Sequence, residues 1–368
     1  MKVERLQLTD FRNYENQQVS FSDNINVITG KNAQGKTNLL EAVYYLTGAK
    51  SFRAGSDREL IQFEKDNTRL QADIFSEGRR QNIQIDFGHA RRKKICVNGV
   101  RLKTASELSG KLTAVLFSPE DLAIIQSSPI CRRRLMDSCL CQMRPRYAAC
   151  LTEYHKLYEA KTRILRDNDF KMQDVLQDFS ERMCETGAVI LYFRARFVRL
   201  LAEIAAEIHH EFSGKTEQLN ITYQTVKSVK NPYAETDVIT GQLMDHMNAH
   251  AAAEAAVGRC LSGIHKDDLL LTVNGQEARR FASQGQARTA AISLKMAERE
   301  ILQRDSGECP VLLLDDVLSE LDAGRQDFIL NRIGNGQVLI TCCEDKSITE
   351  KTGGRVLTVS SGRIFEED

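Results

Sequence analysis

The chain has 368 residues, of which 42% are apolar, and this composition predicts a folded protein with one large or two medium cores. Its 50 Lys and Arg residues balance its 50 Asp and Glu residues, so bulk charge does not indicate nucleic-acid binding. No apolar run approaches the roughly 20 residues of a transmembrane helix, and the first residues are charged where a signal peptide is apolar. The 10 cysteines include no C-x-x-C pair, which argues against a zinc site. We therefore expect a cytoplasmic protein with no membrane contact.

Alternating apolar residues predict strands at 2–8 and 25–29 near the start of the chain. The second strand runs into a glycine-rich loop, and the following "TNLLEAVYYLTG" predicts a helix that ends at Gly48. Short alternating runs continue to about residue 117, with Asn98-Gly99 as a hairpin turn.

From about residue 119 the apolar residues recur at helical spacing, and no proline occurs between Pro145 and Pro232. Strand and turn chemistry returns near residue 258. A helix is predicted after Ser283, and "CPVLLLDD" and "GQVLITCCE" predict buried strands. Because strands and helices bracket a helical middle, we predict an α/β domain that is discontinuous in sequence, with a mixed sheet built from 1–118 and 258–368. The inserted lobe, 119–257, is expected to be mostly helical.

The stretch "GKNAQGKTN" has the pattern of a phosphate-binding loop. Glycines let backbone N–H groups surround phosphate oxygens, and the start of the next helix adds partial positive charge. On this interpretation Lys36 reaches the β- and γ-phosphates of ATP, and Thr37 supplies a hydroxyl to Mg²⁺. A plain glycine turn is the alternative, which the order of strand, loop and helix disfavours. The expected ATP-binding residues are Gly30, Lys31, Asn32, Ala33, Gln34, Gly35, Lys36 and Thr37.

A second oxygen ligand for magnesium is expected as an acid at the end of a neighbouring apolar strand. "VLLLDD" places Asp315 in that position, and Asp316 follows it, where it can orient or deprotonate the attacking water. A helix N-cap is the alternative role for Asp316. Most of the chain separates Lys36 from Asp315, which implies a large insertion and excludes small GTPases and nucleotide kinases.

Four residues just before that strand, Ser283, Gln284, Gly285 and Gln286, resemble the signature motif of ATP-binding-cassette ATPases. The Ser283 hydroxyl, the Gly285 N–H and the helix dipole form a second anion-binding helix start, although a serine N-cap explains the pattern equally well. The segment "SELD", which ends at Asp322, resembles the D-loop of that family. In cassette ATPases the signature motif meets the γ-phosphate bound by the other subunit. The candidate catalytic residues are Lys36, Asp315, Asp316 and Ser283.

Two stretches are locally basic. Residues 89–103 contain six Lys or Arg residues and no acid, and "RRRLMDSCLCQMRPR" forms the second cluster. Such runs either bind DNA phosphates or form a solvated surface, and three adjacent arginines cannot share one helix face. The candidate DNA contacts are Arg91, Arg92, Lys93, Lys94, Arg132 and Arg133.

From end to end the chain resembles the RecF family of bacterial recombination and repair ATPases, which are related to SMC proteins. The resemblance rests on "LQLTDFRNY", the phosphate loop, "FSPEDL", "SPICRRRLMD", "GIHKDDLLLTVNG", "SQGQARTAAISLKMAE" and "LLLDDVLSELD". The segments 129–134 and 265–268 are the most specific, because general cassette ATPases lack them. The second of these either lines an interface or forms a structural His-Asp pair.

The chain departs from the family pattern at few positions. Ile264 and Lys266 stand where proline and arginine are expected, and "TCCE" replaces threonines. The cassette switch histidine is missing, as it is in the family, and Thr341 is the candidate γ-phosphate sensor.

The resemblance implies an ABC-type ATPase that forms a homodimer when ATP binds, with weak, DNA-stimulated hydrolysis to ADP and phosphate. It also implies binding to duplex and gapped DNA, and cooperation with the RecR and RecO mediators in loading recombinase during repair and replication-fork maintenance. The alternative is a soluble ABC-type regulator that acts through protein partners without binding DNA. A small-molecule kinase would have no use for "SELD" and "SQGQ".

Overall fold

The computed structural model describes residues 1–167, 173–334, 336–343 and 350–366, which form two compact units. Unit 1 comprises Met1–Asp121 and Leu294–Asp368, and unit 2 comprises Leu122–Ser293. The predicted α/β class, with a mixed sheet assembled from both ends of the chain around a helical insertion, is confirmed. The predicted domain boundaries differ from this division mainly at 258–293, which packs in unit 2.

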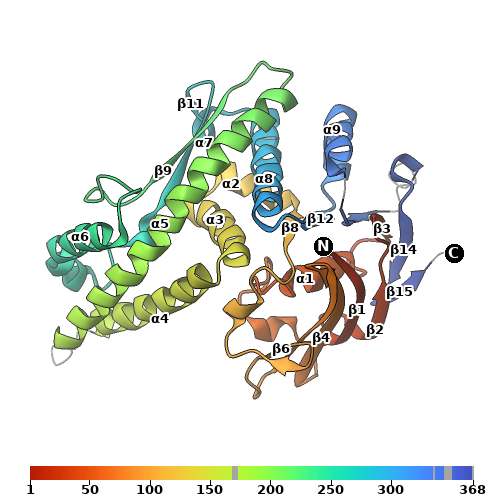
Figure 1. Cartoon of the computed structure of the whole chain (residues 1–368), viewed down its shortest axis with the longest axis horizontal. Helices are drawn as coiled ribbons and strands as arrows, with labels where there is room; N and C mark the ends of the chain where they lie inside the picture. Colours follow the sequence, from red (N-terminus) through yellow and green to blue (C-terminus); the bar gives the residue numbers. More distant parts are fainter. Residues whose placement is uncertain (168–172, 335, 344–349, 367–368) are drawn as a thin grey trace. The chain divides into compact units, whose positions relative to one another are not determined.

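Unit 1 contains an antiparallel sheet and a mixed sheet (Figure 1). The antiparallel sheet has the order β2-β1-β4-β5-β6-β7, with strands β1 Lys2–Phe11, β2 Tyr14–Ser20, β4 Asn67–Ser76, β5 Arg79–Gly88, β6 Lys94–Val97 and β7 Val100–Arg101. The mixed sheet has the order β15-β14-β3-β13-β12-β8, with strands β3 Ile25–Thr29, β8 Ala114–Phe117, β12 Val311–Asp315, β13 Val338–Cys342, β14 Arg355–Ser360 and β15 Arg363–Glu366. The predicted turn at Asn98-Gly99 joins β6 to β7, with both residues at positive φ.

The helices of unit 1 cover the mixed sheet and complete its core. Strands β12 and β13 are buried at every position, as is typical of central parallel strands. Helix α1, Lys36–Tyr45, contacts β8 and β12 through a buried apolar face. The other helical segments are η1 Asp57–Leu60, η2 Ala105–Leu108, η3 Pro119–Asp121, η6 Leu318–Glu320 and α9 Ala323–Ile333. Because β3, β13 and β12 run parallel, their carboxyl ends meet at one edge of the sheet.

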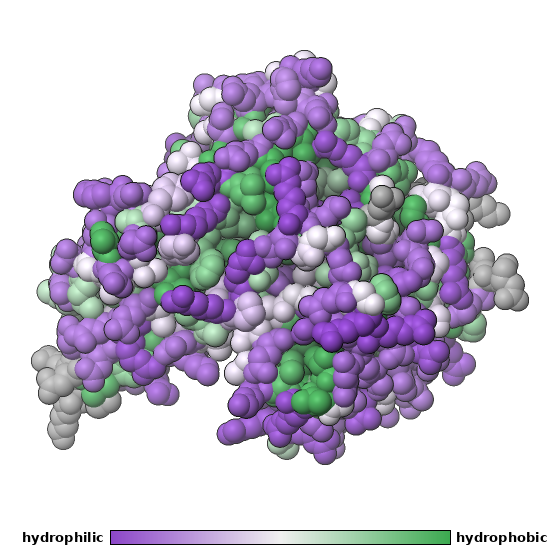
Figure 2. Space-filling model, viewed as in Figure 1, coloured by the Kyte–Doolittle hydropathy of each residue, from purple (hydrophilic) through white to green (hydrophobic). Residues whose placement is uncertain are grey.

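Unit 2 is mostly helical. Its elements are α2 Leu122–Gln126, α3 Pro129–Met143, α4 Pro145–Asp167, α5 Gln173–Phe212, β9 Leu219–Gln224, α6 Thr236–Val257, η5 Ile264–Lys266, β10 Asp268–Val273, β11 Gln276–Glu277, α7 Ala278–Phe281 and the start of α8 Gln284–Ser306, which continues into unit 1. The long helix α5 packs against α4, α6 and β9 (Figure 1). None of the helices in the described part of the chain combines the length and apolar character that a membrane span requires. The face drawn in Figure 2 is mostly hydrophilic, with smaller apolar areas.

Two family-specific segments meet inside unit 2 as a buried charge network. Arg194 of α5 is 1% exposed and donates to Asp267 Oδ2 at 2.9 Å and to Asp137 Oδ1 at 2.7 Å. Arg132 of α3 donates to both carboxylate oxygens of Asp268, at 2.6 and 3.0 Å. Removing one member of such a buried pair leaves an uncompensated charge, which is strongly destabilising. Of the two interpretations of the His-Lys-Asp-Asp segment, the geometry therefore favours the structural one.

His265 makes the stability of unit 2 depend on pH. Its Nδ1 lies 2.9 Å from the Tyr154 hydroxyl, and burial, followed by the charge of Lys266, lowers its pKa from 6.5 to about 4. As the pH falls from 6.5 towards 4, the unfolded state takes up a proton that the folded state does not, so stability is lost through this window.

We expect this loss to reach about 3 kcal/mol. The free energy of unfolding, measured with urea, should therefore fall more steeply between pH 6.5 and 4 for the parent protein than for H265Q. Parallel pH profiles for the two proteins would show that His265 does not titrate in this way.

Candidate nucleotide-binding site

The predicted phosphate loop connects β3 to α1 and has the backbone geometry that its glycines permit. Gly30 and Gly35 have φ values of 143° and 123°. A Cβ atom on Gly30 would lie 2.3 Å from the carbonyl oxygen of Val359, so a side chain is excluded there. No described side chain caps the first turn of α1, which leaves its backbone N–H groups available to an anion.

Residues from the turn between β1 and β2 and from the start of β2 hold the back of this loop. The Asn13 amide donates to Gln34 O at 2.7 Å, and the Tyr14 hydroxyl donates to Gly35 O at 2.9 Å. Asn38 in turn donates to Asn13 Oδ1 at 2.8 Å. Because the loop carbonyls are engaged on this side, the loop conformation is fixed without using its N–H groups. The "DFRNY" segment therefore has a physical role in shaping the phosphate loop.

Lys36 is 4% exposed, and its ammonium group lies against the loop itself. Nζ donates to Gly30 O at 2.7 Å and to Lys31 O at 3.2 Å. Cys343 Sγ is 3.5 Å from the same Nζ, and this thiol also donates to Asn32 Oδ1 at 2.8 Å. Sequence reasoning missed Cys343, and only its place directly after the strand β13 could have indicated it.

Asp315 is the last residue of β12, and its carboxylate accepts hydrogen bonds from two hydroxyl groups of neighbouring elements. Thr37 of α1 and Thr341 of β13 each donate to Asp315 Oδ1 at 2.9 Å. Burial raises the pKa of Asp315, and the two hydrogen bonds from Thr341 and Thr37 oppose this shift. A hydroxyl and a carboxylate in contact are hard oxygen donors of the kind that magnesium prefers.

The next acid, Asp316, sits in a strained backbone position. It has φ of 53°, which is uncommon for a residue with a side chain, and its N–H donates to the Thr341 hydroxyl at 2.9 Å. Its Oδ1 is buried and has no hydrogen-bond partner in the described part of the chain. An unpaired buried carboxylate oxygen is costly unless something else fills the site, and a water is the obvious candidate. The N-cap in this region is instead Asp322, which accepts from Arg325 N at 3.0 Å.

Thr341, the candidate γ-phosphate sensor, has its hydroxyl engaged by the two acids. Its side chain is buried, and its hydroxyl is committed to Asp315 and to the backbone of Asp316. Thr341 therefore holds the two acids in register, while the exposed thiol of Cys343 is the strand-end group beside Lys36.

Two arginines that were not among the candidate site residues, Arg12 and Arg53, also contact this site. Arg12 donates to both oxygens of the buried Glu41 at 2.8 Å, and Ser51 donates to the same carboxylate at 2.5 Å. Arg53 donates to Asn38 Oδ1 at 2.9 Å, and its charge lowers the pKa of Asp315. These partners come from distant segments, so no local pattern in the sequence could indicate them.

The signature residues belong to unit 2 and form the first turn of α8. Ser283 and Gln284 are exposed, and Ser283 makes a reciprocal cap with Gln286. Gln286 N donates to Ser283 Oγ at 3.2 Å, and Ser283 N donates to Gln286 Oε1 at 3.0 Å. The geometry is that of a capping box, which fixes the turn and leaves it at the surface.

The candidate DNA contacts separate into two groups. Lys93 lies 4.2 Å from the centre of the Tyr45 ring and 3.4 Å from Asp57 Oδ2. Arg132 is buried against Asp268, and Arg133 donates to Asp267 O at 2.7 Å. Each of these three side chains therefore has a partner within the fold, and Arg132 is buried while Lys93 and Arg133 are half-buried. Arg91, Arg92 and Lys94 remain exposed.

Comparison with known proteins places these features in a family. The model of the family described as RecF/RecN/SMC N terminal domain matches residues 2–362. A protein of Acetivibrio thermocellus called DNA replication and repair protein RecF is 36% identical, and the alignment covers 99% of this chain and all of that protein. The solved structure of the recombination mediator protein RecF with ATP in the RecFOR pathway has 32% identity and a TM-score of 0.90, covering 100% of this chain and 97% of that one. A second such structure, with ATPrS, has 31% identity and a TM-score of 0.91, covering 100% and 98%.

Replacing Thr341 tests the link between the two acids. T341V keeps the shape of the side chain but leaves the Asp316 N–H without its acceptor and Asp315 with the Thr37 hydroxyl alone, so we expect a loss of about 1–3 kcal/mol in the free energy of unfolding. T341S keeps the hydroxyl and should recover most of this loss. Urea denaturation of the three proteins measures both effects, and a T341V protein as stable as the parent would refute the link.

Proposed function

Because this chain belongs to the RecF family of SMC-related ATPases, we propose that it is an ATP-dependent DNA-binding protein of recombinational repair and replication-fork maintenance. On this proposal ATP drives its dimerisation on duplex or gapped DNA, and the dimer helps the RecO and RecR mediators to load recombinase. The names of its relatives, which refer to DNA replication and repair and to the RecFOR pathway, support the proposal. The observation that carries it is the meeting of Lys36, Thr37 and Asp315 at one sheet edge.

The proposed ATP site uses the loop 30–37 and the start of α1. Backbone N–H groups there donate hydrogen bonds to the β- and γ-phosphates. Lys36 Nζ, which donates to loop carbonyl oxygens in this structure, donates to phosphate oxygens when ATP is bound. Asp316 directs the attacking water through its unpaired Oδ1 and accepts a proton from it. The strained backbone of Asp316 aims this carboxylate in a direction that an ordinary strand end would not give.

Magnesium is the metal that the fold family implies, and the residues present fit it. Thr37 and Asp315 offer a hydroxyl and a carboxylate, and magnesium is usually held by one or two such oxygens together with nucleotide phosphates and waters. No group of three His, Cys, Asp or Glu side chains in the described ranges could hold a metal by itself, which agrees with a site that the nucleotide completes. When bound, the ion neutralises charge on the phosphates. Thr37 and Asp315 would hold the ion through a hydroxyl and a carboxylate oxygen.

Dimerisation follows from the exposed signature turn. Ser283 and the helix dipole of α8 form a donor set at the surface, and we propose that it completes the nucleotide site of a second copy. Asp322, which is 55% exposed, would lie in the same interface. A symmetric dimer then closes two sites at once, and a monomer turns ATP over slowly because each of its sites is incomplete.

Replacing Ser283 tests this arrangement. ATP, but not ADP, should shift the parent protein from monomer to dimer in sedimentation velocity, whereas S283R should stay monomeric and bind nucleotide with unchanged affinity. N248R, at an exposed position on α6, is the matched control and should dimerise like the parent. Normal dimerisation by S283R would disprove the composite site.

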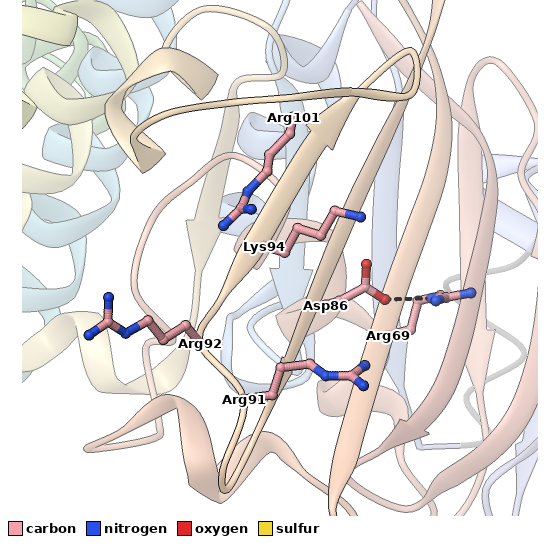
Figure 3. Close-up of a pocket in the computed structure, with 6 residues that line it drawn as sticks. All are labelled: Arg69, Asp86, Arg91, Arg92, Lys94 and Arg101. Atoms are coloured by element: carbon pink, nitrogen blue, oxygen red, sulfur yellow. Dashed lines mark hydrogen bonds and ion pairs between the residues drawn. The ribbon is translucent and has the colours of Figure 1, made fainter.

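A basic pocket in unit 1 supports direct DNA binding (Figure 3). It has a volume of about 370 Å³ and is lined by Arg69, Asp86, Arg91, Arg92, Lys94 and Arg101. Asp86 is already neutralised, because Arg69 donates to its Oδ1 at 2.5 Å and Gln84 donates to its Oδ2 at 2.6 Å. Within the described residues, the other four cations make no ion pair. We propose that this surface receives DNA phosphates, with Arg91 and Lys94 on the side of Asp86 and Arg92 pointing away from it (Figure 3).

The triple variant R91A/K94A/R101A tests the DNA surface. It should bind duplex more weakly at low salt, and the slope of log affinity against log salt should become shallower by about 0.9 for each phosphate that the variant no longer neutralises. R363A, an exposed arginine of β15, is the matched control and should leave the slope unchanged. If the parent protein with ATP binds no duplex at low salt, the chain acts instead as an ABC-type regulator through protein partners.

A further inference from the structure

The signature turn is held by a carboxylate that none of the sequence motifs includes. Gln286 Nε2 donates to Glu217 Oε1 at 2.9 Å, while Gln286 Oε1 accepts from Ser283 N at 3.0 Å. We propose that Glu217 is a positioning residue of the composite nucleotide site, because it fixes the amide of Gln286 and thereby the turn that presents Ser283. This inference rests on the proposed function.

The orientation of the Gln286 amide depends on its partners. An amide has a donor end and an acceptor end of nearly the same shape, so only the groups around it decide which way it faces. Ionised Glu217 can only accept hydrogen bonds, so it selects the orientation in which the NH₂ group faces Glu217 and the oxygen faces the Ser283 N–H. In the flipped orientation two donors would face each other at Ser283.

The position of Glu217 is set by residues near the end of α5 and by the β10–β11 turn. The backbone N–H of Glu217 donates to Ser213 Oγ at 3.1 Å. The next residue, Gln218, exchanges hydrogen bonds with Asn274 in the turn between β10 and β11, at 2.8 and 2.9 Å. The buried His209 lies close to the Glu217 carboxylate, with its Nε2 3.2 Å from Oε2, and makes no hydrogen bond through that nitrogen within the described residues. The backbone of Glu217 is therefore held in place, and its side chain is 19% exposed.

The contacts of Glu217 connect the end of the long helix α5 to the signature turn. All of these contacts lie within unit 2. The phosphate loop lies in unit 1 and shares none of these contacts. Loss of Glu217 should therefore affect the closing of two chains around ATP and leave nucleotide binding by one chain unchanged. A positioning role therefore predicts weaker dimerisation with unchanged nucleotide affinity, whereas general damage to the fold would lower both.

The first experiment compares E217A with E207A. Glu207 is exposed on α5, two residues before His209, and is the matched control. Sedimentation with ATP should show dimerisation weakened about tenfold in E217A, the effect of losing one charge-assisted hydrogen bond, and unchanged in E207A. Nucleotide affinity of the E217A monomer should equal that of the parent. Equal dimerisation by E217A and E207A would overturn the proposal.

A reciprocal exchange of the two side chains covers the case in which E217A fails to fold. Q286E places two carboxylates against each other and should weaken ATP-dependent dimerisation. The double variant E217Q/Q286E restores one donor and one acceptor in contact and should recover dimerisation, whereas a failure to recover would contradict the positioning role. S283R, measured in parallel, separates the two hypotheses. If S283R stays monomeric while E217A dimerises normally, the composite site stands and the role of Glu217 does not; if S283R dimerises, the composite site itself fails.

Discussion

The structure of the nucleotide site depends on the Asp315 carboxylate and the two hydroxyls that bind it. Thr37 follows β3 and Thr341 belongs to β13, and both donate to Asp315 at the end of β12. Three segments from the two ends of the chain must therefore pair in parallel register before Asp315 and the loop 30–37 lie together. The requirement explains why unit 1 is discontinuous and why the helical segment is inserted between the halves.

Local patterns are sufficient to predict much of this site. Glycines before a helix, an apolar strand that ends in acids and a serine before a helix each have a short-range physical cause, so the phosphate loop, Asp315 and the Ser283 turn can be located from sequence. The Asn98-Gly99 hairpin belongs to the same class. Strand β9 escapes prediction inside the helical middle, because its pairing with β10 is long-range.

The side chains that the sequence misplaces have partners far away along the chain. Arg132 carries the charge expected of a DNA contact, yet it is buried against Asp268, and the partly exposed Lys93 lies over the Tyr45 ring. The hydroxyl of Thr341, the candidate γ-phosphate sensor, donates to Asp315 and accepts from the Asp316 N–H. The residue type shows which groups a side chain can bind, and the fold determines which of those groups lies within reach.

Unit 2 contains polar contacts that are buried or half-buried. Arg194 joins α5 to Asp137 and Asp267, and Glu217 contacts the signature turn. Buried pairs of this kind add little net stability, but they specify one arrangement of the groups they join. On the proposed function, the Ser283 turn meets a phosphate bound by another chain, and this contact requires such specificity.

The central claim is that neither copy of the chain completes a catalytic site alone. The most direct measurement is ATP turnover in a mixture of K36A and S283R proteins, each of which should be inactive by itself. In a mixed dimer, Lys36 of the S283R chain and Ser283 of the K36A chain form one intact site, so activity should return on mixing. A mixture as inactive as its separate components, or an S283R protein that is active alone, would contradict the account.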